Sequence, residues 1–132
     1  MLRRAEREQL ARLGLSEREL SILVVTGAAI RSLNRRWRAK DRATDVLSFP
    51  QGGREGPIGD VVISLDAARR QARAGGWPLA LELRRLLAHG VLHCLGYDHE
   101  TPSDAGRMAR QERRLLGRQG MVGSQGPRRG PR

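Results

Sequence analysis

Residues 78–99 of the chain read PLALELRRLLAHGVLHCLGYDH. Apolar residues recur in this stretch at helical spacing, and a proline at the start and a glycine near the end are typical helix boundaries. The pattern predicts one long helix that begins at Pro78 and that Gly96 terminates, after which the chain folds back. The apolar positions of this helix are Leu79, Leu83, Leu86, Leu87, Val91, Leu92 and Leu95.

Shorter segments before and after this helix alternate between strand and helix patterns. Compact apolar and β-branched stretches predict strands at 20–25, 45–49 (stopped by Pro50) and 58–64. Helical spacing and capping residues predict helices at 2–13, 28–37 and 65–74, and from Thr101-Pro102 to about Gly117. The order predicts an α/β (α+β) fold with a small mixed sheet packed with helices. We expect one domain over residues 1–119 and a disordered basic tail over 120–132.

Composition excludes several classes of protein. With 132 residues and 39% apolar residues, the chain has enough material for one buried core, so wholesale disorder is excluded. The longest nearly apolar run, Ile22 to Ile30, is about half a membrane span, and the charged N-terminus has no apolar signal core. The lone cysteine, Cys94, has no disulfide partner in the chain, which fits a reducing compartment. We therefore expect a cytoplasmic protein with no membrane partner.

The net charge of +11 indicates an anionic partner, of which nucleic acid is the most common. Residues 31–42 carry six basic side chains and one acid, and this run is a candidate wall of a binding cleft. A genome-wide bias toward arginine would explain much of the remaining charge without any binding role, because nearly all the basic residues are arginine. Charge alone names no reaction.

All three histidines of the chain fall within residues 89–99. His89 and His93 are four apart on the predicted helix, so they lie on one face about a turn apart. His99 follows the predicted reversal at Gly96 and can approach the same point. Three imidazoles with a free fourth position are typical of a catalytic zinc site, in which the metal lowers the pKa of its water to about 7. The sequence predicts one Zn²⁺ per chain.

Two other zinc chemistries share parts of this pattern. A non-catalytic zinc clip usually has a fourth protein ligand, but Cys94 follows His93 directly, points about 100° away on the helix and reads as a small buried residue. Zinc proteases of the H-x-x-x-H-x-x-G-x-x-H spacing carry a glutamate general base after the first histidine, where this chain has Gly90. Such proteases also place a methionine turn under the metal. Met108 follows His99, but it lies within a predicted helix and is therefore interpreted as a core residue.

Three blocks of the sequence together resemble the YbeY-type endoribonucleases of bacteria and their organellar relatives. These blocks are LNRRWRAKD (33–41) with TDVLSFP (44–50), GDVVIS (59–64) and HGVLHCLGYDH (89–99). The resemblance implies zinc held by His89, His93 and His99, and an arginine needed for activity at Arg38. It also implies cleavage of single-stranded RNA, maturation of the 3′ end of small-subunit ribosomal RNA, and ribosome quality control.

The chain departs from this family in that members commonly carry a further strand before the first helix. Two interpretations are open: either this chain starts downstream of the usual start of the family, or it is a variant whose sheet is smaller and has a barer edge.

The residues are consistent with that chemistry. Phosphodiester cleavage develops negative charge, which the Arg38 guanidinium can neutralise, while either a zinc-bound water or the RNA 2′-hydroxyl attacks phosphorus. Asp98 is either a carboxylate that supports His99 or a turn residue that bonds the backbone. The expected function is a zinc-dependent, single-strand-specific endoribonuclease with ribosomal RNA and the small ribosomal subunit as partners. The alternatives are a non-catalytic, zinc-stabilised ribosome-assembly or RNA-binding factor and a peptidase-like zinc hydrolase.

Overall fold

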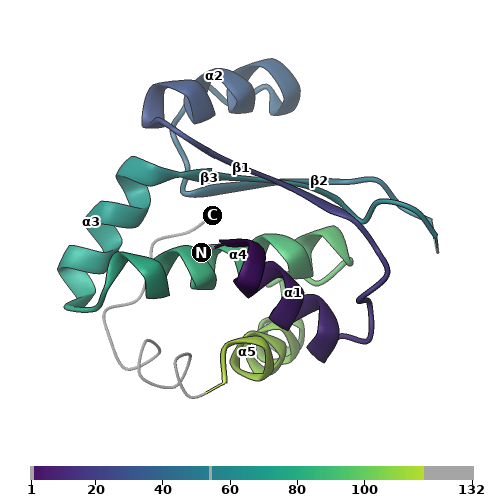
Figure 1. The fold of residues 1–132 in the computed structure, drawn as a ribbon. Helices are drawn as coiled ribbons and strands as arrows, with labels where there is room; N and C mark the ends of the chain where they lie inside the picture. Colours follow the sequence, from purple (N-terminus) through teal and green to yellow (C-terminus); the bar gives the residue numbers. More distant parts are fainter. Residues whose placement is uncertain (1, 54, 118–132) are drawn as a thin grey trace.

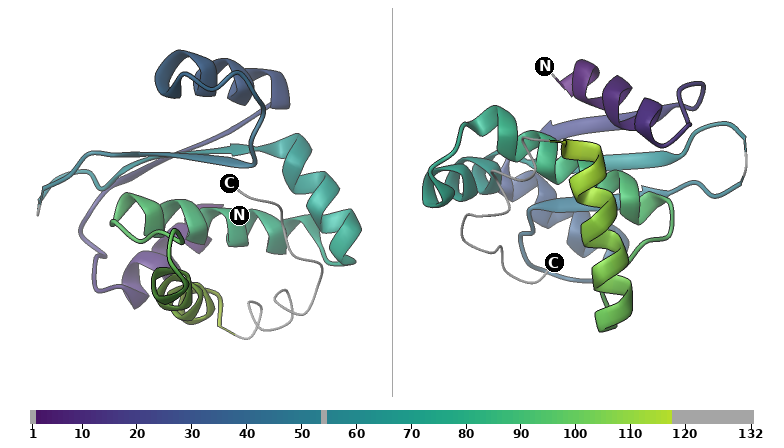
Figure 2. Two further views of the ribbon diagram at one scale, coloured as in Figure 1. Left: turned by 180° about the vertical axis from the view of Figure 1, so that it is seen from behind. Right: turned by 90° about the horizontal axis from the view of Figure 1, so that it is seen from below.

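A mixed three-stranded sheet carries helices on both of its faces (Figures 1 and 2). The computed structural model describes residues 2–53 and 55–117. The elements in chain order are α1 (Leu2–Arg12), β1 (Leu20–Val25), α2 (Gly27–Arg38), β2 (Val46–Pro50), β3 (Gly59–Ser64), α3 (Leu65–Gly75), α4 (Leu79–Cys94) and α5 (Pro102–Leu116). In the sheet order β1-β3-β2, β1 is parallel to β3 and β2 is antiparallel to it. The predicted fold class is confirmed, and the predicted tail at 120–132 lies outside the described residues.

Most predicted boundaries lie within two residues of the observed ones. The first strand has the predicted bounds, and Thr101 caps α5 because its Oγ1 accepts a hydrogen bond from Asp104 N at 3.1 Å. The prediction that β2 stops before Pro50 is wrong by one residue, because Pro50 still pairs with Gly59. A proline is tolerated there because β2 borders the sheet, where a missing N–H costs no ladder hydrogen bond.

The two faces of the sheet contribute to two different cores. Side chains alternate along a strand, so Val61 and Ile63 of β3 pack toward α4, whereas Val62 packs with Ile30 of α2. The larger core, between the sheet and α4, also contains Val46, Leu83, Leu86, Leu87 and Val91. The long helix is thus pressed against β2 and β3, and this contact fixes the position of its histidines relative to the sheet.

A further layer covers the far side of α4. Met108 and Leu115 of α5 are buried against Leu92 of α4, which confirms Met108 as a core residue. Arg12 of α1 donates from Nη1 to the carbonyl oxygen of Leu115 at 2.7 Å and so ties the C-terminal end of α5 to the first helix. The last helix is therefore held at a fixed position beside the helix that carries two of the histidines.

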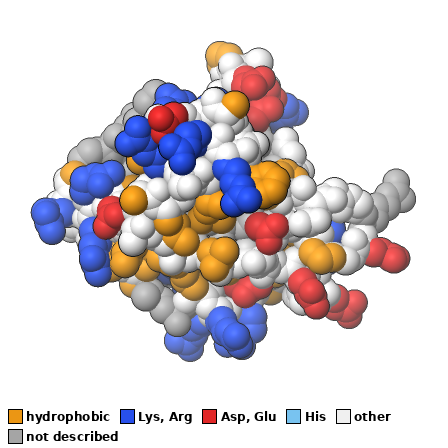
Figure 3. Space-filling view, turned by 90° about the horizontal axis from the view of Figure 1, so that it is seen from above, with side chains coloured by type: hydrophobic (Ala, Val, Ile, Leu, Met, Phe, Trp, Pro, Cys, Tyr) orange, Lys and Arg blue, Asp and Glu red, His pale blue; other side chains and the backbone are white. Residues whose placement is uncertain are grey.

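The face of the molecule that carries α2 exposes apolar side chains between basic ones (Figure 3). The large apolar side chains exposed there and on β1 are Leu23, Val24 and Trp37, with Trp37 64% exposed. In the described part of the chain, β1 pairs only with β3 and therefore forms one edge of the sheet. Among the described helices, none has both the length and the apolar character that crossing a membrane requires.

Candidate metal centre

His89 and His93 project from the same face of α4 toward one point. Because they are one helical turn apart, their Nε2 atoms meet at 2.8 Å, with the two rings in an edge-to-face arrangement. His89 is 2% exposed, whereas His93 is half-buried and faces the pocket. The helix therefore delivers one buried and one accessible imidazole to the same position.

His99 reaches that position through two successive turns. Helix α4 ends at Cys94, and Gly96 adopts φ +98°, a conformation that glycine accepts without a steric penalty. Asp98 Oδ1 then accepts a hydrogen bond from Glu100 N at 3.1 Å, which closes the second turn around His99. Of the two readings of Asp98, this bond fits the turn residue.

The three imidazoles form a group that could hold a metal ion. One ligand atom from each of His89, His93 and His99 lies within 4.8 Å of the others. Zinc–nitrogen bonds of about 2.0–2.1 Å at tetrahedral angles separate two ligand atoms by about 3.3 Å. The ligand atoms of the three histidines are separated by distances from 2.8 Å to at most 4.8 Å, a range that includes this value. Within residues 2–53 and 55–117 the group contains only these three side chains, and three protein ligands are the number typical of catalytic zinc sites.

The glycine that follows the first histidine lies where α4 approaches the sheet most closely. A Cβ at Gly90 would lie 2.5 Å from Val61 Cγ1, closer than side chains pack in proteins. Ser48 Oγ on β2 donates to the Gly90 carbonyl oxygen at 3.0 Å, so a polar bond also joins helix and sheet here. Position 90 therefore faces the sheet, and the general base that zinc proteases carry at this position has no room in this fold.

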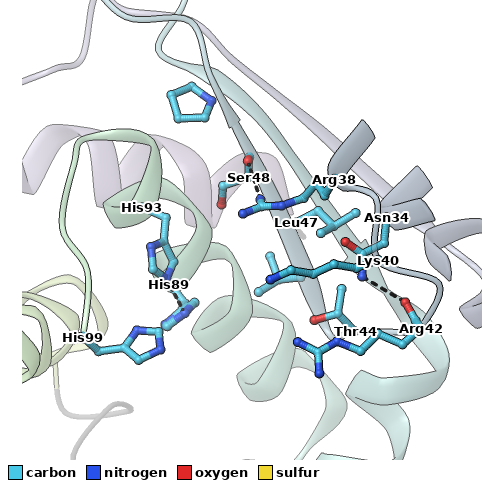
Figure 4. Close-up of a pocket in the computed structure, with 12 residues that line it drawn as sticks. Asn34, Arg38, Lys40, Arg42, Thr44, Leu47, Ser48, His89, His93 and His99 are labelled. Carbon is cyan, nitrogen blue, oxygen red and sulfur yellow. Dashed lines mark hydrogen bonds between the residues drawn. The ribbon is translucent and has the colours of Figure 1, made fainter. Parts of the chain in front are cut away.

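Basic side chains from the α2–β2 connection lie across the pocket from the histidines (Figure 4). Arg38, at the end of α2, donates from Nη1 to the Ser48 carbonyl oxygen at 3.4 Å and remains exposed. Lys40 and Arg42 come from the following loop. The pocket has a volume of about 240 Å³ and is lined by Asn34, Arg38, Lys40, Arg42, Thr44, Val46, Leu47, Ser48, Pro50, His89, His93 and His99.

A buried asparagine shapes this basic wall. Asn34 of α2 donates from Nδ2 to the Arg42 carbonyl oxygen at 3.0 Å. The main-chain carbonyl oxygen of Asn34 accepts a hydrogen bond from the N–H of Ala39, the residue that caps the helix. Ala39 takes the left-handed conformation, φ 56°, which reverses the chain after Arg38. No local sequence pattern indicates this role of Asn34, because its contacts depend on how the loop folds back.

Cys94 points away from the histidines. Its Sγ lies 3.9 Å from the Asp60 carbonyl oxygen and close to Gly59 on β3. Burial raises the pKa of the Cys94 thiol to about 11. This placement confirms the reading of Cys94 as a small buried residue and separates it from the ligand group.

The raised pKa predicts low reactivity of this thiol. Only the thiolate is nucleophilic, and a pKa of about 11 in place of the ordinary thiol pKa near 9.0 lowers the thiolate fraction at pH 8 by about 100-fold. We expect iodoacetamide to alkylate the native protein at least about 100-fold more slowly than the urea-unfolded chain, as measured by mass spectrometry. Equal rates in the two states would show that Cys94 is accessible.

A carboxylate that the sequence analysis missed lies behind the histidines. Glu112 Oε1 of α5 is 3.4 Å from His89 Nδ1. The sequence indicates the position of Glu112 only through helical spacing. Glu112 lies four residues after the buried Met108, and therefore on the face of α5 that packs on α4.

Comparisons with known proteins match most of the chain. The family described as Endoribonuclease YbeY matches residues 2–120. A Myxococcus xanthus protein named Endoribonuclease YbeY is 58% identical over 122 residues, covering 88% of this chain and 42% of the relative. One of the same name from Anaeromyxobacter dehalogenans is 57% identical over 118 residues, covering 87% of this chain and 61% of the relative. The chain thus spans about half the length of these relatives.

The fold has a counterpart among solved structures. A solution structure of a Thermotoga maritima protein superposes with a TM-score of 0.61 at 23% sequence identity, covering 99% of this chain and 91% of that protein. This likeness supports the architecture, whereas the sequence matches identify the family. On these matches, with the HGVLHCLGYDH block on α4 and its turn, the chain belongs to the Endoribonuclease YbeY family.

Proposed function

We propose that this chain is a zinc-dependent endoribonuclease that cleaves single-stranded RNA. The observation that carries the proposal is the pocket in which three histidines face Arg38, Lys40 and Arg42. Cleavage of a phosphodiester is favoured by cationic side chains that bind its oxygens and by a Lewis acid that polarises them. Arg38, Lys40 and Arg42 can supply the cations, and a metal ion held by the three histidines would supply the Lewis acid. The names of the relatives, which describe endoribonucleases, point to the same reaction.

Each side chain has a role that follows from its position. His89, His93 and His99 would hold the zinc, which would supply Lewis acidity and would make hydroxide available near neutral pH. Arg38 is exposed and anchored on one side by the Ser48 carbonyl oxygen, so its remaining N–H groups are free to donate to phosphoryl oxygens as negative charge develops. Lys40 would hold a neighbouring phosphate of the strand.

We further propose that ribosomal RNA and the small ribosomal subunit are the physiological partners and that the reaction matures the 3′ end of the small-subunit RNA in the cytoplasm, as part of ribosome quality control. The support is the family membership together with the net charge of +11, which favours a large polyanion. Binding through phosphates rather than bases gives weak sequence specificity and a strong dependence on salt.

The two alternative functions fit the site less well. A zinc ion that only stabilises the fold usually has four protein ligands, whereas three form this group in the described residues. A peptidase-like reaction needs a general base after the first histidine, but position 90 packs on Val61.

Replacing Arg38 tests the proposal. We expect Arg38→Ala to lower kcat/KM for a fluorescent single-stranded RNA by about 100-fold, because one donor to a developing oxyanion contributes about 10²–10³ in rate. The zinc content should stay at the wild-type value, because the Arg38 side chain contacts Ser48 rather than a histidine. Arg70→Ala on α3 is the matched control, since it removes the same charge from an exposed position outside the pocket.

A chelator should abolish cleavage by the wild-type protein, and added Zn²⁺ should restore it. Equal cleavage by wild type, Arg38→Ala and the chelated sample would indicate a contaminating nuclease and overturn the proposal. Stoichiometric zinc and RNA binding without cleavage would support the assembly-factor alternative.

A further inference from the structure

The two nitrogens of the His89 ring face different partners. Nε2 points toward His93 Nε2 at 2.8 Å, inside the ligand group, whereas Nδ1 lies 3.4 Å from Glu112 Oε1 on α5. The ring therefore lies between the pocket and a carboxylate from α5, a helix that contributes no residue to the pocket lining.

Both side chains of this contact are shielded from solvent over most of their surface. The His89 side chain is 3% exposed and that of Glu112 is 21% exposed. Helix α5 is fixed on both sides of Glu112, because Met108 and Leu115 are buried against α4 and Arg12 bonds the Leu115 carbonyl oxygen. The carboxylate thus has little freedom to move away from the imidazole.

The position of this carboxylate selects one tautomer of His89. An ionised carboxylate only accepts hydrogen bonds, and a neutral imidazole carries its single N–H on one of its two nitrogens. The N–H therefore belongs on Nδ1, toward Glu112, which leaves the lone pair on Nε2 directed at the ligand group. A metal-binding histidine needs that lone pair, and a carboxylate on its other nitrogen also raises its basicity.

We propose that Glu112 is a positioning residue that holds His89 as the Nδ1–H tautomer with Nε2 directed at the metal. The inference rests on the proposed metal site and adds to it a residue that acts through His89 without touching the ion. Asp98, the carboxylate that the sequence suggested for such a role, bonds the backbone of its own turn.

The test compares zinc affinity and the His89 tautomer in the full chain of four proteins: wild type, Glu112→Ala, Glu112→Gln and Glu17→Gln. Zinc affinity comes from competition with a chromophoric chelator. We expect Glu112→Ala to bind Zn²⁺ about 10–100-fold more weakly, the usual effect of losing such a partner. Glu112→Gln should recover part of the affinity, because its amide oxygen still accepts from Nδ1. Glu17 is exposed in the turn after α1, so Glu17→Gln controls for the lost charge.

The tautomer readout does not depend on metal or activity. Long-range ¹H–¹⁵N spectra of the metal-free wild type should show His89 with the proton on Nδ1, and Glu112→Ala should move it toward the Nε2–H form. Unchanged His89 signals in Glu112→Ala, or wild-type zinc affinity in that variant, would overturn the inference. If the wild type itself bound no zinc, the proposed function would fail, while the metal-free spectra would still decide the role of Glu112. Thermal unfolding of each metal-free variant checks that α5 remains packed.

Discussion

Replacing His93 by alanine is expected to weaken zinc binding by more than about 100-fold and to reduce RNA cleavage below detection. Losing only the hydrogen-bond partner of a ligand costs about 10–100-fold in affinity, so losing one of three ligands must cost more. The ring centroids lie 4.4 Å (His89–His93), 5.5 Å (His93–His99) and 5.9 Å (His89–His99) apart, so the three rings form a triangle and the substitution removes one of its corners. Metal analysis of the purified protein, followed by a cleavage assay, measures both effects.

The same substitution separates metal binding from folding. A ligand that binds only the folded state stabilises it by about 4 kcal/mol at a free concentration 1,000-fold above its Kd, which raises Tm by roughly 15 °C in a domain of this size. Zinc should therefore raise the Tm of the wild type by about this amount and leave the Tm of His93→Ala nearly unchanged. Without metal the two proteins should unfold at similar temperatures, because His93 lies outside the three buried cores.

Cys94→Ala is the matched control for His93→Ala, because it changes the next residue of the same helix and removes another side chain of a type that binds zinc. Its Sγ faces the Asp60 carbonyl oxygen on β3, so the variant should retain stoichiometric zinc. Loss of zinc from Cys94→Ala, or full zinc binding by His93→Ala, would contradict the three-histidine site.

Local signals in the sequence were sufficient for the elements and for the histidine cluster. The compact run at Leu20–Val25, the cap at Thr101 and the reversal at Gly96 each depend on neighbours within a few residues, and the structure has all three. The convergence of the histidines was predictable for the same reason, because helical periodicity places His89 beside His93 and one turn brings His99 back. Their role in binding metal stays a prediction.

Features that depend on distant parts of the chain were not predictable in this way. The sheet order β1-β3-β2 depends on which strands pair, and no local pattern specifies that. Glu112 meets His89 across 23 positions of sequence, through the packing of α5 on α4. Arg38 was singled out by family resemblance, and its place opposite the histidines depends on the loop that Asn34 holds. Each of these contacts requires the assembled core.

Gly90 is a residue that the sequence comparison read only as a missing catalytic base. In the structure it is the point where α4 meets the sheet, with its carbonyl oxygen bonded by Ser48 and its Cα against Val61. Glycine costs a helix about 1 kcal/mol relative to alanine, so its presence mid-helix needs a reason. Close packing supplies it, because the helix that carries His89 can approach β2 and β3 only without a side chain at position 90.

Gly90→Ala is therefore expected to destabilise the metal-free protein by about 1–3 kcal/mol, the range for overpacked cores, despite the gain in helix propensity. The added Cβ would lie 2.5 Å from Val61 Cγ1, and Val61 is fully buried, so helix and sheet must separate. That movement would weaken the Ser48 bond and shift His89 and His93 away from Arg38. Urea unfolding measures the free energy, and zinc titration measures the effect on the site.

Two further variants show whether the loss comes from this contact. Gly106→Ala makes the same change on α5, where the new Cβ would meet only Arg110 Nη1 at 3.5 Å, so it should raise stability by about 0.5–1 kcal/mol. In a Val61→Ala background the colliding methyl groups are absent, and Gly90→Ala should cost at least about 1 kcal/mol less than in the wild type. If Gly90→Ala stabilised the protein as Gly106→Ala does, α4 would have to lie further from the sheet. The histidines would then not be held opposite Arg38 by the packing at Gly90.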